Sequence, residues 1–148
     1  MKSNKGFTLI ELLAVIVILA IIALIATPII LNVIDTAKKG SAESSALGYI
    51  DGVENQVMVA QVTSDTTDDI AYPGDYKTVA AAKETYDEGE IFVEVKGSQP
   101  KAGSTVKINE KGLVSEACLA IELGGKTYNV GYTAADGAKV QPDACIAG

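Results

Sequence analysis

The chain has 148 residues with 12 lysines, 19 acidic residues, no arginine and no histidine, which gives a formal net charge of −7. The absence of histidine excludes Ser-His-Asp and Cys-His catalytic systems and the usual histidine-containing zinc sites. Because affinity for nucleic acid depends on cationic side chains that neutralise phosphates, this acidic composition also predicts no direct binding of nucleic acid. We therefore expect no catalytic, cofactor-binding or metal site, and no cofactor.

The N-terminal region places a short basic leader, residues 1–6 with two lysines, directly before a long apolar run. From residue 12 to residue 31 only Thr27 and Pro28 interrupt leucine, isoleucine, valine and alanine. Twenty helical residues span about 30 Å, the hydrocarbon thickness of a bilayer. By the positive-inside rule, the leader lysines would keep the N-terminus in the cytoplasm, so the chain after residue 31 would face outward.

Glu11 is the one charged residue at the edge of this apolar run. An ionised group in hydrocarbon is costly, so an acid at such a position indicates a function that involves a partner. The alternative is a plain membrane anchor whose Glu11 carboxylate reaches the lipid headgroups.

The order of these features differs from that of an ordinary secretory signal, because the small residue Gly6 precedes the apolar block, which would survive a cut there. Gly6, Phe7 and Glu11 in this register, ahead of a membrane span, resemble the leader of type IV prepilins. The resemblance implies that a prepilin peptidase in the membrane cleaves after Gly6, that Phe7 becomes an N-methylated terminus, and that Glu11 guides assembly. It also includes a proline within the apolar helix, Pro28, which we predict to be a second assembly residue and where we expect a kink.

The resemblance further implies a structural subunit of a type IV pilus. Such a subunit would lie in the lipid bilayer as a single-pass precursor, pass through the pilus assembly machinery and join an extracellular helical homopolymer through its N-terminal helix. A pseudopilin of a type II secretion or DNA-uptake (competence) apparatus shares the N-terminal motif and is the first alternative. A minor adhesin pilin at the filament tip is the second.

After the membrane span, apolar residues recur mostly every three to five positions and predict that the helix continues as an amphipathic segment over residues 32–62. Gly40, Gly48 and Gly52 each cost about 1 kcal/mol relative to alanine in a helix interior. Close packing of the head against the helix is one explanation for these glycines, and a functional hinge is the other. The polar, turn-prone residues 63–69 predict the end of the helix.

Residues 63–148 predict a small exported head. A turn at Tyr72–Asp75 and a weakly indicated short helix at residues 79–86 precede a region in which apolar residues alternate with polar ones. That alternation predicts strands at Glu90–Lys96, Thr105–Asn109, Leu113–Leu123 and Lys126–Tyr132. The Gly-Gly pair before residue 126 predicts a tight hairpin, and residues 133–148 show little regular structure. We expect an α+β fold, the type IV pilin fold, with the long N-terminal helix packed against a small antiparallel sheet.

The two cysteines, Cys118 and Cys145, both fall in the predicted head. They could be buried free thiols or a disulfide, and the resemblance implies the disulfide, since many pilins close their C-terminal region by such a loop. For a loop of about 28 residues, the chain-entropy model predicts roughly 3 to 4 kcal/mol of stabilisation.

Two groups of acidic residues are candidates for a calcium site or for a pair of catalytic carboxylates. Asp65, Asp68 and Asp69 could offer oxygen ligands to calcium, but their spacing does not follow a calcium-loop pattern. Asp68-Asp69 and the acids of residues 87–90 could be paired catalytic carboxylates, but such charge runs are usually solvated surface.

Overall fold

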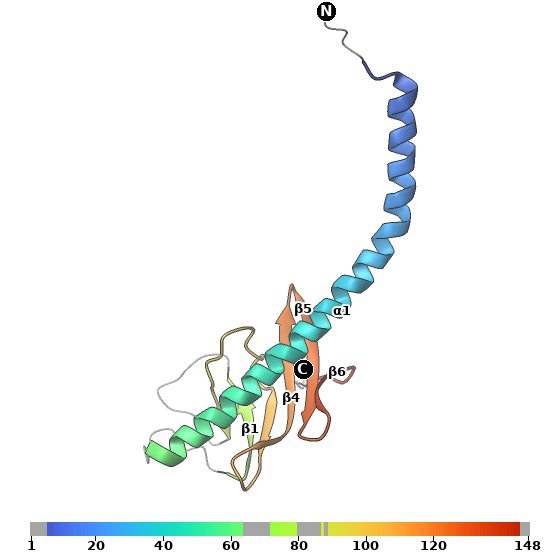
Figure 1. Cartoon of the computed structure of the whole chain (residues 1–148). Helices are drawn as coiled ribbons and strands as arrows, with labels where there is room; N and C mark the ends of the chain where they lie inside the picture. The colour runs from blue at the N-terminus through green and yellow to red at the C-terminus, as the bar shows by residue number, and fades with distance from the viewer. Residues whose placement is uncertain (1–5, 64–71, 80–86, 88, 146–148) are drawn as a thin grey trace, which may run out of the picture. The chain divides into compact units, whose positions relative to one another are not determined.

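The computed structural model describes residues 6–63, 72–79, 87 and 89–145. In that part of the chain one helix, α1 (Leu9–Thr63), is followed by six strands (Figure 1). The strands are β1 (Gly74–Thr78), β2 (Glu90–Ile91), β3 (Thr105–Ile108), β4 (Val114–Leu123), β5 (Lys126–Thr133) and β6 (Gly137–Gln141). The expected α+β architecture, consistent with the type IV pilin fold, is confirmed. The chain divides into two compact units, Met1–Ala37 and Lys38–Gly148.

In the first unit, α1 is apolar on all sides. It is long and apolar enough to cross a membrane, and none of its most apolar window is buried within the structure. A helix that is hydrophobic all round needs an apolar environment that the chain itself does not supply.

Pro28 lies inside α1, which continues through it without a break. Since proline has no backbone N–H, the carbonyl four residues earlier loses its usual donor. The neighbouring Thr27 Oγ1 donates to the Ala23 carbonyl at 2.7 Å, an arrangement that often bends helices. A kink at Pro28 stays a prediction.

In the second unit, one stripe of α1 packs against one face of the sheet. The helix contributes small and medium side chains at three- and four-residue spacing, which keeps them on one side. The core residues from the helix are Ala42, Ala46, Tyr49, Ile50, Val53 and Val57. The inward residues of the strands complete this core, among them Val106, Val114, Leu119, Ile121, Tyr128 and Val130.

The six strands form one sheet in the order β2-β1-β3-β4-β5-β6. Every neighbouring pair is antiparallel except β1 and β2, which run parallel. The sheet is therefore mixed and larger than the three- or four-stranded antiparallel meander predicted. The predicted Gly-Gly hairpin is confirmed, because Leu123 pairs with Lys126 and both Gly124 and Gly125 have positive φ.

The strand predicted at Glu90–Lys96 ends after Ile91. Val93 and Val95 instead lie in irregular backbone, with Val93 buried in the core and Val95 half-buried against it. The Gln99 side-chain amide donates to the Val93 carbonyl at 3.2 Å and accepts from Val95 N at 2.9 Å. This side chain supplies the hydrogen bonds that a neighbouring strand would have supplied.

Two strands arise where the sequence analysis expected none. β1 begins at Gly74, within the predicted turn, and directs Tyr76 and Thr78 inward. β6 forms in the C-terminal segment and is held by antiparallel pairing with β5. The short helix predicted at residues 79–86 lies outside the described residues, apart from Val79.

The three helix glycines differ in how closely other parts of the chain pack against them. A Cβ on Gly52 would lie 2.8 Å from Val95 Cγ1 and 3.0 Å from Val93 Cγ1, so close packing against the head is confirmed there. A Cβ on Gly40 or Gly48 would meet nothing within 4 Å among the described residues, so the same explanation is wrong at those two positions.

Candidate functional site

The N-terminus of α1 is closed by a reciprocal hydrogen-bonded motif. Glu11 Oε2 accepts from the Thr8 backbone N at 2.7 Å and from Thr8 Oγ1 at 2.6 Å, while Glu11 N donates to Thr8 Oγ1 at 3.3 Å. This is a capping box, in which a threonine and a glutamate three residues later satisfy each other's backbone donors at a helix start. A negative side chain at this position also interacts favourably with the helix dipole.

Thr8 is the site residue that the sequence analysis missed. The pattern Thr-x-x-Glu immediately before an apolar run is a sequence signature of a capping box, so the information was available locally. Glu11 consequently has an intramolecular role in this structure: it fixes where α1 begins.

The predicted cleavage junction lies just before this cap. Phe7 is 91% exposed, and a Cβ built on Gly6 would meet nothing within 4 Å. Residues 1–5 of the leader lie outside the described part of the chain. A peptidase would therefore find the Gly6–Phe7 bond in irregular backbone ahead of the first helical turn.

The structure places the predicted assembly residues at two separate points of the helix. Glu11 lies in the first turn of α1, and Pro28 follows 17 residues later, which corresponds to about 25 Å along a helix. Pro28 therefore does not belong to the cap, and any role for it is exerted on the helix itself.

The disulfide closes the C-terminal end of the head. Cys118 of β4 and Cys145, which follows β6, are joined with an S–S distance of 2.05 Å, the pairing that the resemblance implied. Gln141 Nε2 donates to Cys118 Sγ at 3.0 Å, and Cys145 N donates to Asn129 Oδ1 at 3.4 Å. Cys145 is only 8% exposed. The bond therefore fastens the segment after β6 to the centre of the sheet.

Gly131 explains how Gln141 reaches the disulfide. A Cβ on Gly131 would lie 2.5 Å from Gln141 Oε1 and 2.9 Å from its Cδ. The glutamine amide thus occupies the space that any larger residue at position 131 would fill. This mid-strand glycine has a packing reason that its sequence context does not reveal.

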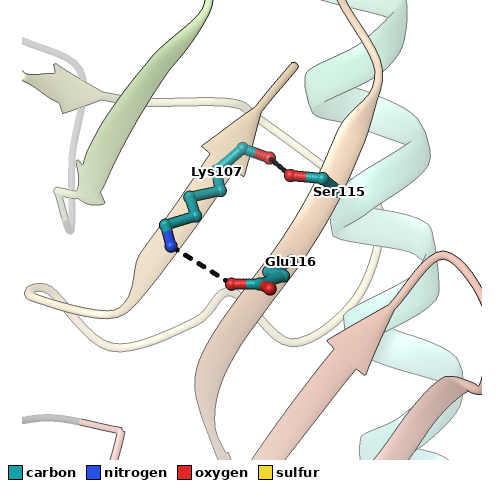
Figure 2. Close-up of polar contacts among 3 residues, drawn as sticks. All are labelled: Lys107, Ser115 and Glu116. Carbon is teal, nitrogen blue, oxygen red and sulfur yellow. Dashed lines mark hydrogen bonds and ion pairs between the residues drawn. The ribbon is translucent and has the colours of Figure 1, made fainter.

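The face of the sheet turned away from α1 is polar and hollowed. A cavity of about 920 Å³ opens there, and side chains of both charges line it, among them Asp75, Lys77, Lys107, Glu116, Asp136 and Lys139. Lys107 Nζ contacts Glu116 Oε2 at 3.2 Å, and Ser115 Oγ donates to the Lys107 carbonyl at 3.3 Å (Figure 2). The hydrogen bond and charge of Glu116, with a further contribution from Asp75, raise the pKa of Lys107. Charges on this face are thus partly compensated within the sheet.

Most of the acidic residues considered above as calcium ligands or paired carboxylates lie outside the described part of the chain. Asp65, Asp68, Asp69 and Glu88 lie outside the described residues. In the described part, no three histidine, cysteine, aspartate or glutamate side chains gather in a way that could hold a metal ion.

Comparison with known proteins gives a match in the N-terminal region. Residues 1–27 match the family described as the prokaryotic N-terminal methylation motif. This motif is the class III signal peptide of type IV pilins and pseudopilins. The chain carries a prepilin-type leader. No curated protein and no solved structure matches the chain significantly.

Several coarse properties follow from the prepilin-type leader. The motif implies processing by a prepilin peptidase and assembly into a polymer. Proteins with this motif are structural pilin-like proteins, which are not enzymes. Together with the exposed apolar helix, it fits a membrane-anchored precursor of the pilin or pseudopilin type.

Proposed function

We propose that this chain is the structural subunit of a type IV pilus and has no enzymatic activity. Residues 1–6 form the leader, and residues 7–31 cross the membrane and later form the filament core. Residues 32–62 continue the helix as an amphipathic segment, and residues 63–148 form the exported head with its sheet. The observation that carries the proposal is the coincidence of a prepilin-type leader with a helix whose most apolar window is not buried by any described part of the chain.

The exposed apolar surface of this helix favours filament formation. The lipid bilayer solvates the apolar surface of the precursor, and after extraction only the same segment of neighbouring subunits offers an equivalent environment. The partners are therefore the bilayer, the prepilin peptidase, the membrane assembly machinery and other copies of the chain.

Glu11 has two roles in this proposal. In the free subunit it caps α1 through Thr8. During addition to a filament it pairs with the cationic amine that cleavage creates on Phe7 of a neighbouring subunit. Opposite charges attract strongly where water is scarce, but burial also carries a desolvation cost, so the pair specifies register more than it adds stability.

A pseudopilin is the second candidate, because the same leader occurs in both classes. The head favours the pilus subunit, since a disulfide fastens its C-terminal segment as in many pilins. A minor tip adhesin would differ from both in stoichiometry.

Mass spectrometry of filaments sheared from the cell surface tests the proposal. We expect this chain to be the dominant component, to begin at Phe7 and to carry one added methyl group. Surface filaments that lack the chain would contradict the pilus assignment, as would a chain retaining residues 1–6. A trace amount within filaments of another subunit would favour the tip adhesin.

A further inference from the structure

The sheet has one edge at β6, where a helix side chain takes the place of a further strand. Val140 pairs with Val130 of β5, yet its backbone N donates to Glu43 Oε1 at 2.9 Å. This N–H therefore points away from β5. Because amide directions alternate along an antiparallel strand, the amide of Ala138 points to the same open side.

A second helix carboxylate makes the same kind of bond in a different setting. Glu54 Oε1 accepts from Val114 N at 3.0 Å. Val114 pairs with Ile108 of β3 where the β3–β4 register shifts at a bulge. It belongs to the central strand β4 and lies two residues before Glu116, where the pairing of β4 with β5 begins. Glu43 and Glu54 are eleven residues apart, about three helical turns, so they occupy one stripe of α1. The two carboxylates thus form a matched pair, with one on the edge strand β6 and one at the start of the central strand β4.

An edge strand with a free N–H is a template for pairing with another chain. A carboxylate that accepts this N–H forms a charge-assisted bond, which is stronger than the amide–carbonyl bond of a ladder. An incoming strand would have to displace the carboxylate and bring its own carbonyl oxygen close to that negative charge. Both effects oppose strand addition at β6.

We propose that Glu43 closes the β6 edge against pairing with β6 of a second copy of this chain. Copies of one chain present identical edges, which can pair symmetrically as antiparallel strands. Wherever many copies accumulate, in a membrane or in a polymer, this block prevents the heads from joining through their sheets. The inference does not depend on the pilus assignment.

The full-length chain in detergent micelles allows a direct test, using Glu43→Ala, Glu43→Gln, Glu54→Ala and a surface control, Glu122→Ala. Glu122 contacts Lys101 at 2.8 Å in an exposed ion pair. The apolar segment is identical in all variants, so differences between them report on the head. Glu43→Ala should exchange the Val140 amide roughly tenfold faster or more, because a bond to a charged acceptor is lost. Glu43→Gln keeps an oxygen acceptor but loses its charge, so its Val140 amide should exchange at a rate between those of the wild type and Glu43→Ala.

Sedimentation velocity then distinguishes edge opening from simple destabilisation. Glu43→Ala should dimerise at concentrations where the wild type and Glu122→Ala have one chain per micelle. Glu54→Ala should lose stability without dimerising, since its bond is to the central strand β4 and leaves the β6 edge closed. Adding Val140→Pro to Glu43→Ala removes the free donor and should restore the monomer, since proline is tolerated on edge strands.

A Glu43→Ala chain that remains monomeric would overturn the proposal, whether or not Val140 exchange changes. Equal dimerisation of Glu43→Ala and Glu54→Ala would also overturn it, because the cause would then be lost stability rather than an open edge.

Discussion

The two halves of α1 differ in how their apolar residues are arranged and in what covers them. Between Leu9 and Ile34 the large side chains are exposed on every side. Between Ala42 and Val57 only one stripe is buried, and it lies against the sheet. The comparison shows that one continuous helix can serve two environments: the first half depends on lipid or other chains, and the second stabilises the head by itself.

Truncating a core side chain should give the largest difference in stability between a variant of the head and a variant of the exposed half of α1. Leu119→Ala removes a side chain that is 0% exposed and should lower the free energy of unfolding of the head by about 2 to 5 kcal/mol. Leu24→Ala, on the exposed half, should leave it unchanged. Chemical denaturation of both variants in detergent measures the effect. Equal losses would mean that the first half also stabilises the head.

Removing the disulfide should have the next largest effect. The double variant Cys118→Ala and Cys145→Ala loses the cross-link between β4 and the C-terminal segment. We expect a loss of roughly 3 kcal/mol and faster proteolysis after β6, because the unfolded chain is no longer constrained. Cleavage of the leader should proceed normally. Limited proteolysis with mass spectrometry checks both statements, and an unchanged cleavage pattern in the C-terminal segment would contradict the first.

The helix glycines offer a matched pair within one element. Gly52→Ala should destabilise the head by about 1 to 3 kcal/mol, because its Cβ would overlap Val93 and Val95. Gly48→Ala should stabilise it by about 1 kcal/mol, because the Cβ meets open space and alanine favours the helix. Thermal unfolding of the two variants should therefore shift in opposite directions. A shift in the same direction would show that Gly48 also packs closely.

Features of the fold and of the candidate site could be predicted from the sequence where the interacting residues are close together in the chain. The start of α1, its apolar half and the Gly-Gly hairpin rest on neighbouring residues, so local patterns predicted them. Thr8 was equally local and was overlooked. Gly6, Phe7 and Glu11 could be predicted as cleavage and assembly residues because they lie within one short motif. These roles stay predictions.

The missed features depend on partners that are distant in sequence. β6 is short and has no strong alternation of apolar residues, so its pairing with β5 decides its conformation. Glu43 and Val140 are separated by 97 positions. Nothing near Gly48 or Gly52 indicates that only Gly52 faces Val93 and Val95. Tertiary contacts of this kind override local preference.

Tyr49 should give the smallest effect. Its hydroxyl is buried in the core without a hydrogen-bond partner among the described residues, so Tyr49→Phe should be neutral or stabilise the head by about 1 kcal/mol. Burial also raises the pKa of Tyr49 and, more weakly, that of Tyr76. The head should therefore keep its full stability below the ordinary tyrosine pKa of about 10 and lose stability as the pH rises further.

Tyr49→Phe should reduce this alkaline loss without abolishing it, because Tyr76 remains. Denaturation at pH 8 and at pH 11 measures the difference. An identical alkaline loss in Tyr49→Phe and wild type would contradict the assignment to Tyr49.

The yield of surface filaments from cells whose only copy is Glu11→Gln tests the central claim most directly. Glutamine keeps the capping box with Thr8 but removes the charge that pairs with the Phe7 amine. We predict normal insertion and leader cleavage with few or no filaments, as for Glu11→Val, and an intermediate yield for Glu11→Asp. Thr8→Ala, which weakens only the cap, should retain filaments. Normal yield from Glu11→Gln would contradict the account, because Glu11 would then act as a helix cap alone.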